Sequence, residues 1–130
     1  MEYKFKLENF RKASFKLKEA LVRSKQAEFK DDLLNAGLVQ TFEFTLELAW
    51  KVLKAYLSSE GIVTKTPKDT VRQAFKIGFI SDGDLWLEAL GDRNLTSHIY
   101  NDEIAINVVG NIANKYAKIL IDLEQKFNSV

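Results

Sequence analysis

Cysteine is absent from this sequence, and histidine (His98) and proline (Pro67) occur once each. Without cysteine the chain can form neither a disulfide nor a zinc site built from thiolates. With one histidine, and with no glycine-rich phosphate loop, HExxH or EF-hand pattern, the sequence predicts no metal ion and no other cofactor. Only one proline and six glycines are available to interrupt long helices.

Long apolar runs are missing as well. No segment reaches the ~20 apolar residues that cross a bilayer, and the first ten residues, MEYKFKLENF, lack the apolar core of a secretion signal. Hydrophobic residues make up 46% of the chain and charged residues 28%, which is typical of a globular domain. We therefore expect one domain over residues 1–130, in the cytoplasm, with no membrane contact.

The net charge is only +1, but basic residues gather near the start of the chain. Residues 1–30 contain nine lysines and arginines against four acidic residues. A basic first helix can bind phosphates, although a solvated outer face is the commoner role of such a pattern. Both interpretations stay open.

Apolar or small residues recur at spacings of three and four in three segments, which predicts three long amphipathic helices. The expected stripes are Leu7, Phe10, Ser14, Leu17 and Leu21; Val39, Phe42, Leu46, Ala49, Leu53 and Tyr56; and Ile106, Val109, Ala113, Tyr116, Leu120, Leu123 and Phe127. The second helix should run from about Ala36 to Ser58, and the last should begin near Asp102 or Glu103.

Two shorter helices are predicted between these segments. Thr66 can cap a helix whose first residue is Pro67 and which ends near Gly78. Ser81–Asp84 begins the next one. No β-type alternation of useful length is present. The sequence predicts an all-α fold, an up-and-down antiparallel bundle of four or five helices, with over two-thirds of its residues helical.

The segment Asp92–Asn101 is unusually rich in polar side chains. If it is helical, Arg93, Ser97 and Tyr100 share one stripe, and Asn94 and His98 share the neighbouring one. Ser97 and His98 are adjacent and point about 100° apart, which argues against a serine–histidine nucleophilic pair.

The residues of this segment suit phosphate chemistry. Arg93 can hold a phosphate through two parallel hydrogen bonds, and His98 can transfer a proton near neutral pH. A purely structural role remains open for each of them. His98 can be a buried hydrogen-bonding group, Tyr100 can close the core, and Arg93 can pair with Asp92, Asp102 or Glu103.

A second polar row, Glu43, Glu47 and Lys51, lies beside Trp50 in the second predicted helix. Glu47 and Lys51 have the spacing of an ordinary helix ion pair, worth about 0.2–0.5 kcal/mol. A supporting role of Glu47 and Trp50 in a polar site is the alternative. The other aromatic residues of the middle of the chain are expected in the core or in a subunit contact. They are Phe42, Phe44, Phe75, Phe79 and Trp86.

Four pieces of the chain, in this order, resemble the nucleotidyltransferase substrate-binding proteins of the HEPN (higher eukaryote and prokaryote nucleotide-binding) superfamily. They are FEFTLELAWK (42–51), PKDTVRQAFKIGFI (67–80), Trp86 and DRNLTSHIYN (92–101). The resemblance runs from about Phe5 to Phe127. Its most specific element is Arg93-Asn94 followed by His98 and Tyr100.

This resemblance implies a helical bundle, commonly dimeric, encoded beside a small nucleotidyltransferase that lacks its own substrate-binding domain. HepT-type members resemble metal-independent ribonuclease toxins, which the nucleotidyltransferase neutralises by attaching nucleotides to a tyrosine. On that pattern Arg93 and His98 match the catalytic pair, and Tyr100 matches the modified tyrosine. Arg93, Asn94 and Ser97 are the residues expected to bind nucleotide or RNA.

Three functions follow as hypotheses. The first is a partner subunit of a minimal nucleotidyltransferase that binds nucleotide or RNA at the Arg93–Tyr100 segment. The second is a metal-independent endoribonuclease toxin, and the third is a bundle that only oligomerises. A ribonuclease needs both a base and an acid, and each chain has one histidine. Ribonuclease activity therefore predicts a homodimer, or a higher oligomer, that brings two copies of Arg93 and His98 together.

Overall fold

The computed structural model describes residues 3–98 and 102–130, and the side chains of all of these except 95–98 and 102–104. Well over two-thirds of the described residues are helical and none of them forms a strand, so the predicted all-α class is confirmed. The elements are α1 (Tyr3–Gln26), α2 (Asp32–Ser59), α3 (Pro67–Lys76), α4 (Gly83–His98), α5 (Asp102–Asn111), a π-helical turn (Ile112–Tyr116) and α6 (Ala117–Phe127). Within the described ranges, no helix combines the length and the apolar character needed to cross a membrane.

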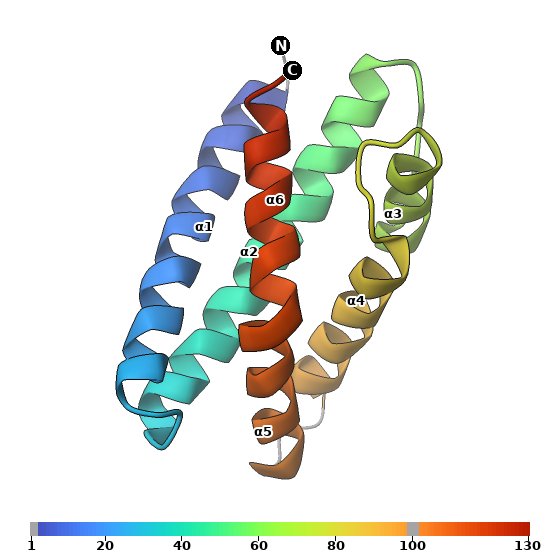
Figure 1. Ribbon diagram of the computed structural model, residues 1–130. Coiled ribbons are helices and arrows are strands. Elements are labelled where there is room, and N and C mark those ends of the chain that lie inside the picture. The colour runs from blue at the N-terminus through green and yellow to red at the C-terminus, as the bar shows by residue number, and fades with distance from the viewer. Residues whose placement is uncertain (1–2, 99–101) are drawn as a thin grey trace.

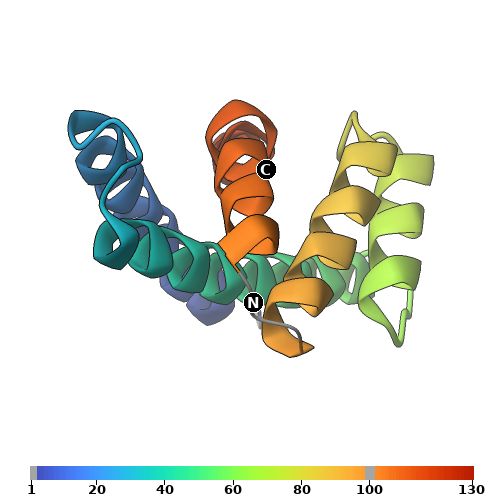
Figure 2. The same cartoon turned by 90° about the horizontal axis from the view of Figure 1, so that it is seen from below.

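The helices form an up-and-down bundle. In Figure 1, α1 and α4 run downward, whereas α2 and the rod formed by α5, the π turn and α6 run upward. Figure 2 shows α2 crossing the molecule, with α1 near one end of it, the α5–α6 rod in the middle and the α3–α4 pair near the other end. Helix α2 therefore contacts every other part of the bundle.

The core is a continuous set of apolar side chains centred on α2. Phe10 of α1 and Phe42 of α2 are fully buried, as their stripes predict. The Phe42 ring stacks on Tyr116, with ring centroids 5.4 Å apart. Burying one such side chain contributes roughly 1.5–3 kcal/mol, so the three-four stripes account for the packing of the long helices.

The helix ends follow the predicted signals. The Thr66 hydroxyl accepts a hydrogen bond from the backbone N–H of Asp69 at 3.1 Å, and Pro67 is the first residue of α3. Gly78 follows α3 with φ +79°, a left-handed conformation that other residues resist. Helix α2 begins earlier than expected, at Asp32, because the Asp31 carboxylate accepts from the N–H of Leu34 at 3.0 Å and caps it there.

Other expectations about the core were wrong. Ile106 is 70% exposed, whereas Val108 and Ile112 are buried in its place. The π turn causes this change, because its extra residue rotates the apolar stripe of α5 relative to that of α6. Phe44 and Phe75 were expected in the core or in a subunit contact; they are more than half exposed in the single chain, so they are not core residues, and a subunit contact stays a prediction.

Candidate functional site

Helix α4 carries the polar segment that the sequence singled out. Its helical backbone continues past Gly91 to His98, so Arg93 and Ser97 lie on one stripe and Asn94 and His98 on the next. The side chains of Ser97 and His98, and all of Tyr100, lie outside the described part of the chain. The shared stripe of Arg93 and Tyr100 stays a prediction.

Arg93 connects α4 to α2. Its Nη1 donates a hydrogen bond to Glu47 Oε2, and its Nη2 donates to Asn94 Oδ1 at 3.3 Å. A hydrogen bond between two charged groups is stronger than one between neutral groups. One acidic partner of Arg93 therefore comes from another helix, a contact that the sequence did not suggest.

Glu47 is the centre of this polar contact. Besides Arg93, its carboxylate accepts from Trp50 Nε1 at 3.0 Å and pairs with Lys51 Nζ at 3.4 Å. Burial raises the pKa of Glu47, but the hydrogen bond from Trp50 and the charges of Arg93 and Lys51 outweigh burial and leave the pKa below its ordinary value. Glu47 is thus ionised at neutral pH and fixes the Arg93 guanidinium. The expected Glu47–Lys51 ion pair is confirmed.

An open groove of about 490 Å³ begins at this ion pair and extends between α1 and α2. Its lining residues are Ala13, Lys16, Gln40, Thr41, Glu43, Phe44, Glu47 and Arg93. The cations Arg93 and Lys16 line the same groove, and the Phe44 ring is 59% exposed in it. This combination can hold a phosphate and offer an aromatic face to a base.

A second polar set lies on another side of α4. Asp92 Oδ2 accepts from the Tyr116 hydroxyl at 2.5 Å and from Asn111 Nδ2 at 3.0 Å. Burial, followed by the hydrogen bond to Asp92 and its negative charge, raises the pKa of Tyr116 well above its ordinary range. This set could not be predicted from the sequence, because Tyr116 fits the apolar stripe and Asn111 lies far from Asp92 along the chain.

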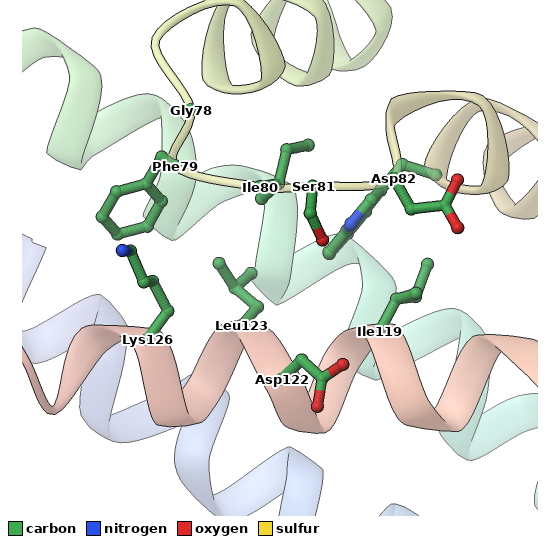
Figure 3. A pocket seen from close by; sticks show the side chains of 10 residues that line it. Gly78, Phe79, Ile80, Ser81, Asp82, Ile119, Asp122, Leu123 and Lys126 are labelled. Atoms are coloured by element: carbon green, nitrogen blue, oxygen red, sulfur yellow. The ribbon is translucent and has the colours of Figure 1, made fainter.

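A smaller hollow of about 290 Å³ separates the loop after α3 from α6 (Figure 3). Its acidic groups already have structural partners. Asp82 accepts from the N–H of Leu85 at the start of α4, and Asp122 pairs with Lys118 at 2.8 Å. Arg93 and Asn94 do not line it, so the groove beside Arg93 is the better candidate site. Among the described side chains, no group of three or more histidines or acids is placed to hold a metal ion.

Comparison with known proteins gives matches over most of the chain. Residues 5–129 match the family model described as nucleotidyltransferase substrate binding protein like. The chain is 37% identical over 92 residues to a protein of Haemophilus influenzae named probable ribonuclease HepT. That match covers 67% of this chain and 63% of the relative, which is less than two-thirds of the relative's length.

Two solved structures are similar to the bundle. The first is a Haemophilus influenzae protein reported as having the fold of a substrate-binding domain of a nucleotidyltransferase. It has a TM-score of 0.83 and 29% identity, and the match covers 94% of this chain and 98% of the other. The second is a tri-AMPylated HEPN toxin of Shewanella oneidensis in complex with MNT antitoxin, with a TM-score of 0.78 and coverages of 98% and 97%. At 11% identity, this second likeness concerns the fold alone.

Proposed function

Because the chain belongs to the nucleotidyltransferase substrate-binding protein family, we propose that it is the partner subunit of a small nucleotidyltransferase and binds nucleotide or RNA through Arg93. The observation that carries this proposal is the Arg93 guanidinium, held by Glu47 at the end of an open groove. Asn94 and Ser97, on the same turn of α4, are the proposed additional ligands of the phosphate.

The groove has suitable size and chemistry for a nucleotide unit. Its volume lies within the roughly 300–1,000 Å³ that small-molecule sites occupy. A guanidinium has five N–H donors in a rigid fork, so Arg93 can contact Glu47 and a phosphate together. Lys16 supplies a second positive charge, and the exposed Phe44 ring supplies a stacking surface.

In this proposal Tyr100 is the group that the nucleotidyltransferase modifies. The support is the AMPylated state of the HEPN toxin with the same fold, together with the spacing of Arg93 and Tyr100. Attachment would form a bond between the phenolic oxygen and the α-phosphorus of a nucleoside triphosphate and release pyrophosphate. Arg93 would hold the phosphates during that transfer.

The test is expression of the chain with and without the nucleotidyltransferase encoded nearest to it, scoring growth and complex formation together. We expect a stable complex by size-exclusion chromatography and a growth defect only when the partner is missing. A labelled single-stranded RNA should bind the isolated chain, and Arg93→Ala should weaken that binding. Arg72→Ala, which removes an equal charge from the exposed face of α3, is the matched control. Equal RNA binding by the two variants and no complex would refute the proposal.

A second candidate function is metal-independent RNA cleavage, favoured by the 37% identity to a probable ribonuclease. The RNA 2′-hydroxyl would attack its own phosphorus, forming a cyclic phosphate and releasing the 5′-oxygen. One His98 cannot both accept the hydroxyl proton and protonate the leaving oxygen at the same time. This function therefore requires a two-fold dimer that supplies a second Arg93 and His98.

Cleavage and binding can be separated by mutation. His98→Ala should lower the cleavage rate by about 10²–10⁴-fold and leave RNA binding nearly unchanged, because neutral imidazole attracts phosphate weakly. Arg93→Ala should reduce both, and EDTA should reduce neither. Cleavage that survives His98→Ala, or that EDTA removes, would point to a contaminating nuclease.

A further inference from the structure

The described turn of α4 that carries Arg93, Gly91–Asn94, contains no buried residue. The last residues of α4 known to be buried are Ala89 and Leu90. From Gly91 to Asn94 each residue is half-buried or exposed. Apolar packing therefore fixes the first half of α4, whereas in Gly91–Asn94 the hydrogen bonds to other helices come from Asp92 and Arg93.

These polar contacts act on two sides of the helix. Arg93 contacts Glu47 on α2, and Asp92 contacts Tyr116 and Asn111 on the last helical rod. Consecutive helix residues point about 100° apart, so the two contacts restrain the rotation of α4 about its axis.

The π turn is what lets two side chains reach Asp92. In a regular α-helix, Asn111 and Tyr116 would point about 140° apart, because they are separated by five residues. In the π turn, the N–H of Ala117 bonds to the carbonyl of Ile112, which places residues five apart nearly above one another. Asn111 and Tyr116 therefore donate to the same oxygen, Asp92 Oδ2.

We propose that Asp92, Asn111 and Tyr116 form a positioning set that fixes the rotation of α4 and thereby holds Arg93 at the groove. This inference rests on the proposed function of Arg93 as the phosphate ligand. The set does not touch the ligand; it acts through the backbone of α4. The buried Tyr116 hydroxyl has no other role in the proposed function, and the Tyr116 ring already has its core partner in Phe42.

The test removes the hydroxyl and keeps the ring, by Tyr116→Phe. The first readout is the side-chain Nε–Hε resonance of Arg93 in ¹H–¹⁵N spectra, assigned with Arg93→Lys. The second is the affinity for a fluorescein-labelled single-stranded RNA. Tyr56→Phe is the matched control, because it removes a hydroxyl from a different aromatic cluster, formed with Tyr3, Phe79 and Phe127.

We expect Tyr116→Phe and Asn111→Ala to shift and broaden the Arg93 resonance and to weaken RNA binding. The expected loss of affinity is roughly tenfold, the size of effect that follows when a metal ligand loses the hydrogen-bond partner that orients it. Tyr56→Phe should change neither readout. The double variant Asp92→Asn/Asn111→Asp places the amide at position 92 and the carboxylate at position 111, so the two side chains can again form a hydrogen bond. It should restore part of the RNA affinity that Asp92→Asn alone loses. A double variant whose RNA affinity is no higher than that of Asp92→Asn would refute the pairing of Asp92 with Asn111.

The two proposals fail in different ways. An unchanged Arg93 resonance in Tyr116→Phe overturns the positioning set, whatever the RNA affinity. A changed resonance with unchanged RNA affinity also overturns it, provided that Arg93→Ala loses the affinity. If Arg93→Ala binds RNA as well as the native chain does, the proposed function fails, and the resonance still decides whether the set orients Arg93.

Discussion

Replacing Glu47 with glutamine removes the negative charge that three donors share and keeps nearly the same side-chain shape. Arg93, Trp50 and Lys51 all contact this carboxylate. After Glu47→Gln the amide oxygen can still accept from Trp50, but its NH₂ group cannot accept from Arg93. The native ion pair is therefore lost while the packing of α2 is kept.

The magnitude follows from the exposure of the pair. Fully exposed ion pairs contribute about 0.2–1 kcal/mol, and hydrogen bonds to charged groups about 1.5–3 kcal/mol. The Arg93 and Glu47 side chains are 22% and 34% exposed, so water screens part of their attraction. We expect Glu47→Gln to lower the free energy of unfolding by about 1 kcal/mol and Tm by about 3–5 °C.

The pH dependence gives the decisive measurement. Because the pKa of Glu47 is lowered in the folded chain, its contribution is present above the unfolded value of 4.5 and is lost as pH falls through the folded pKa. In urea denaturation the native chain and the variant should differ at pH 7, and the difference should shrink as the pH falls below 4.5. Glu88→Gln is the control, because Glu88 pairs with Lys115 and both side chains are nearly half exposed. This variant should lower the free energy of unfolding by less than about 0.5 kcal/mol. A Glu47→Gln effect on the free energy of unfolding that does not shrink as the pH falls below 4.5 would refute the reasoning.

Three further outcomes are expected. Incubation with the nucleotidyltransferase and ATP should raise the intact mass by whole nucleotide units, and Tyr100→Phe should abolish the rise; modification that persists would make Tyr100 structural. Below pH 10, Tyr116→Phe should lower the free energy of unfolding by about 1.5–3 kcal/mol. Because the folded pKa of Tyr116 is raised, this difference should shrink as pH rises above about 10 in urea denaturation, and a difference that stays constant would contradict the assignment. Thr66→Ala should lower the free energy of unfolding by about 1 kcal/mol through loss of the α3 cap, whereas Thr41→Ala, within α2, should cost less; equal costs would argue against the cap.

The sequence by itself determined which segments are helical and where the candidate site was sought. Three-four spacing of apolar residues, the Thr66-Pro67 start and the glycine at the end of α3 are local signals, and local signals depend only on nearby residues. The polar segment that begins at Asp92 was identified in the same way, because its composition departs from an amphipathic stripe. Its helical backbone up to His98 agrees with the stripe assignments made from spacing.

Only the tertiary structure decided which side chains meet. Glu47 and Arg93 come from different helices, and no spacing along the chain links them. The same holds for Asp92 with Tyr116, which also depends on a π turn. One extra residue in a helix changes the face of every residue beyond it, and sequence periodicity cannot locate that insertion when apolar residues occur on several faces. The exposure of Ile106 has this cause, because the stripe that predicted its burial assumed an uninterrupted α-helix.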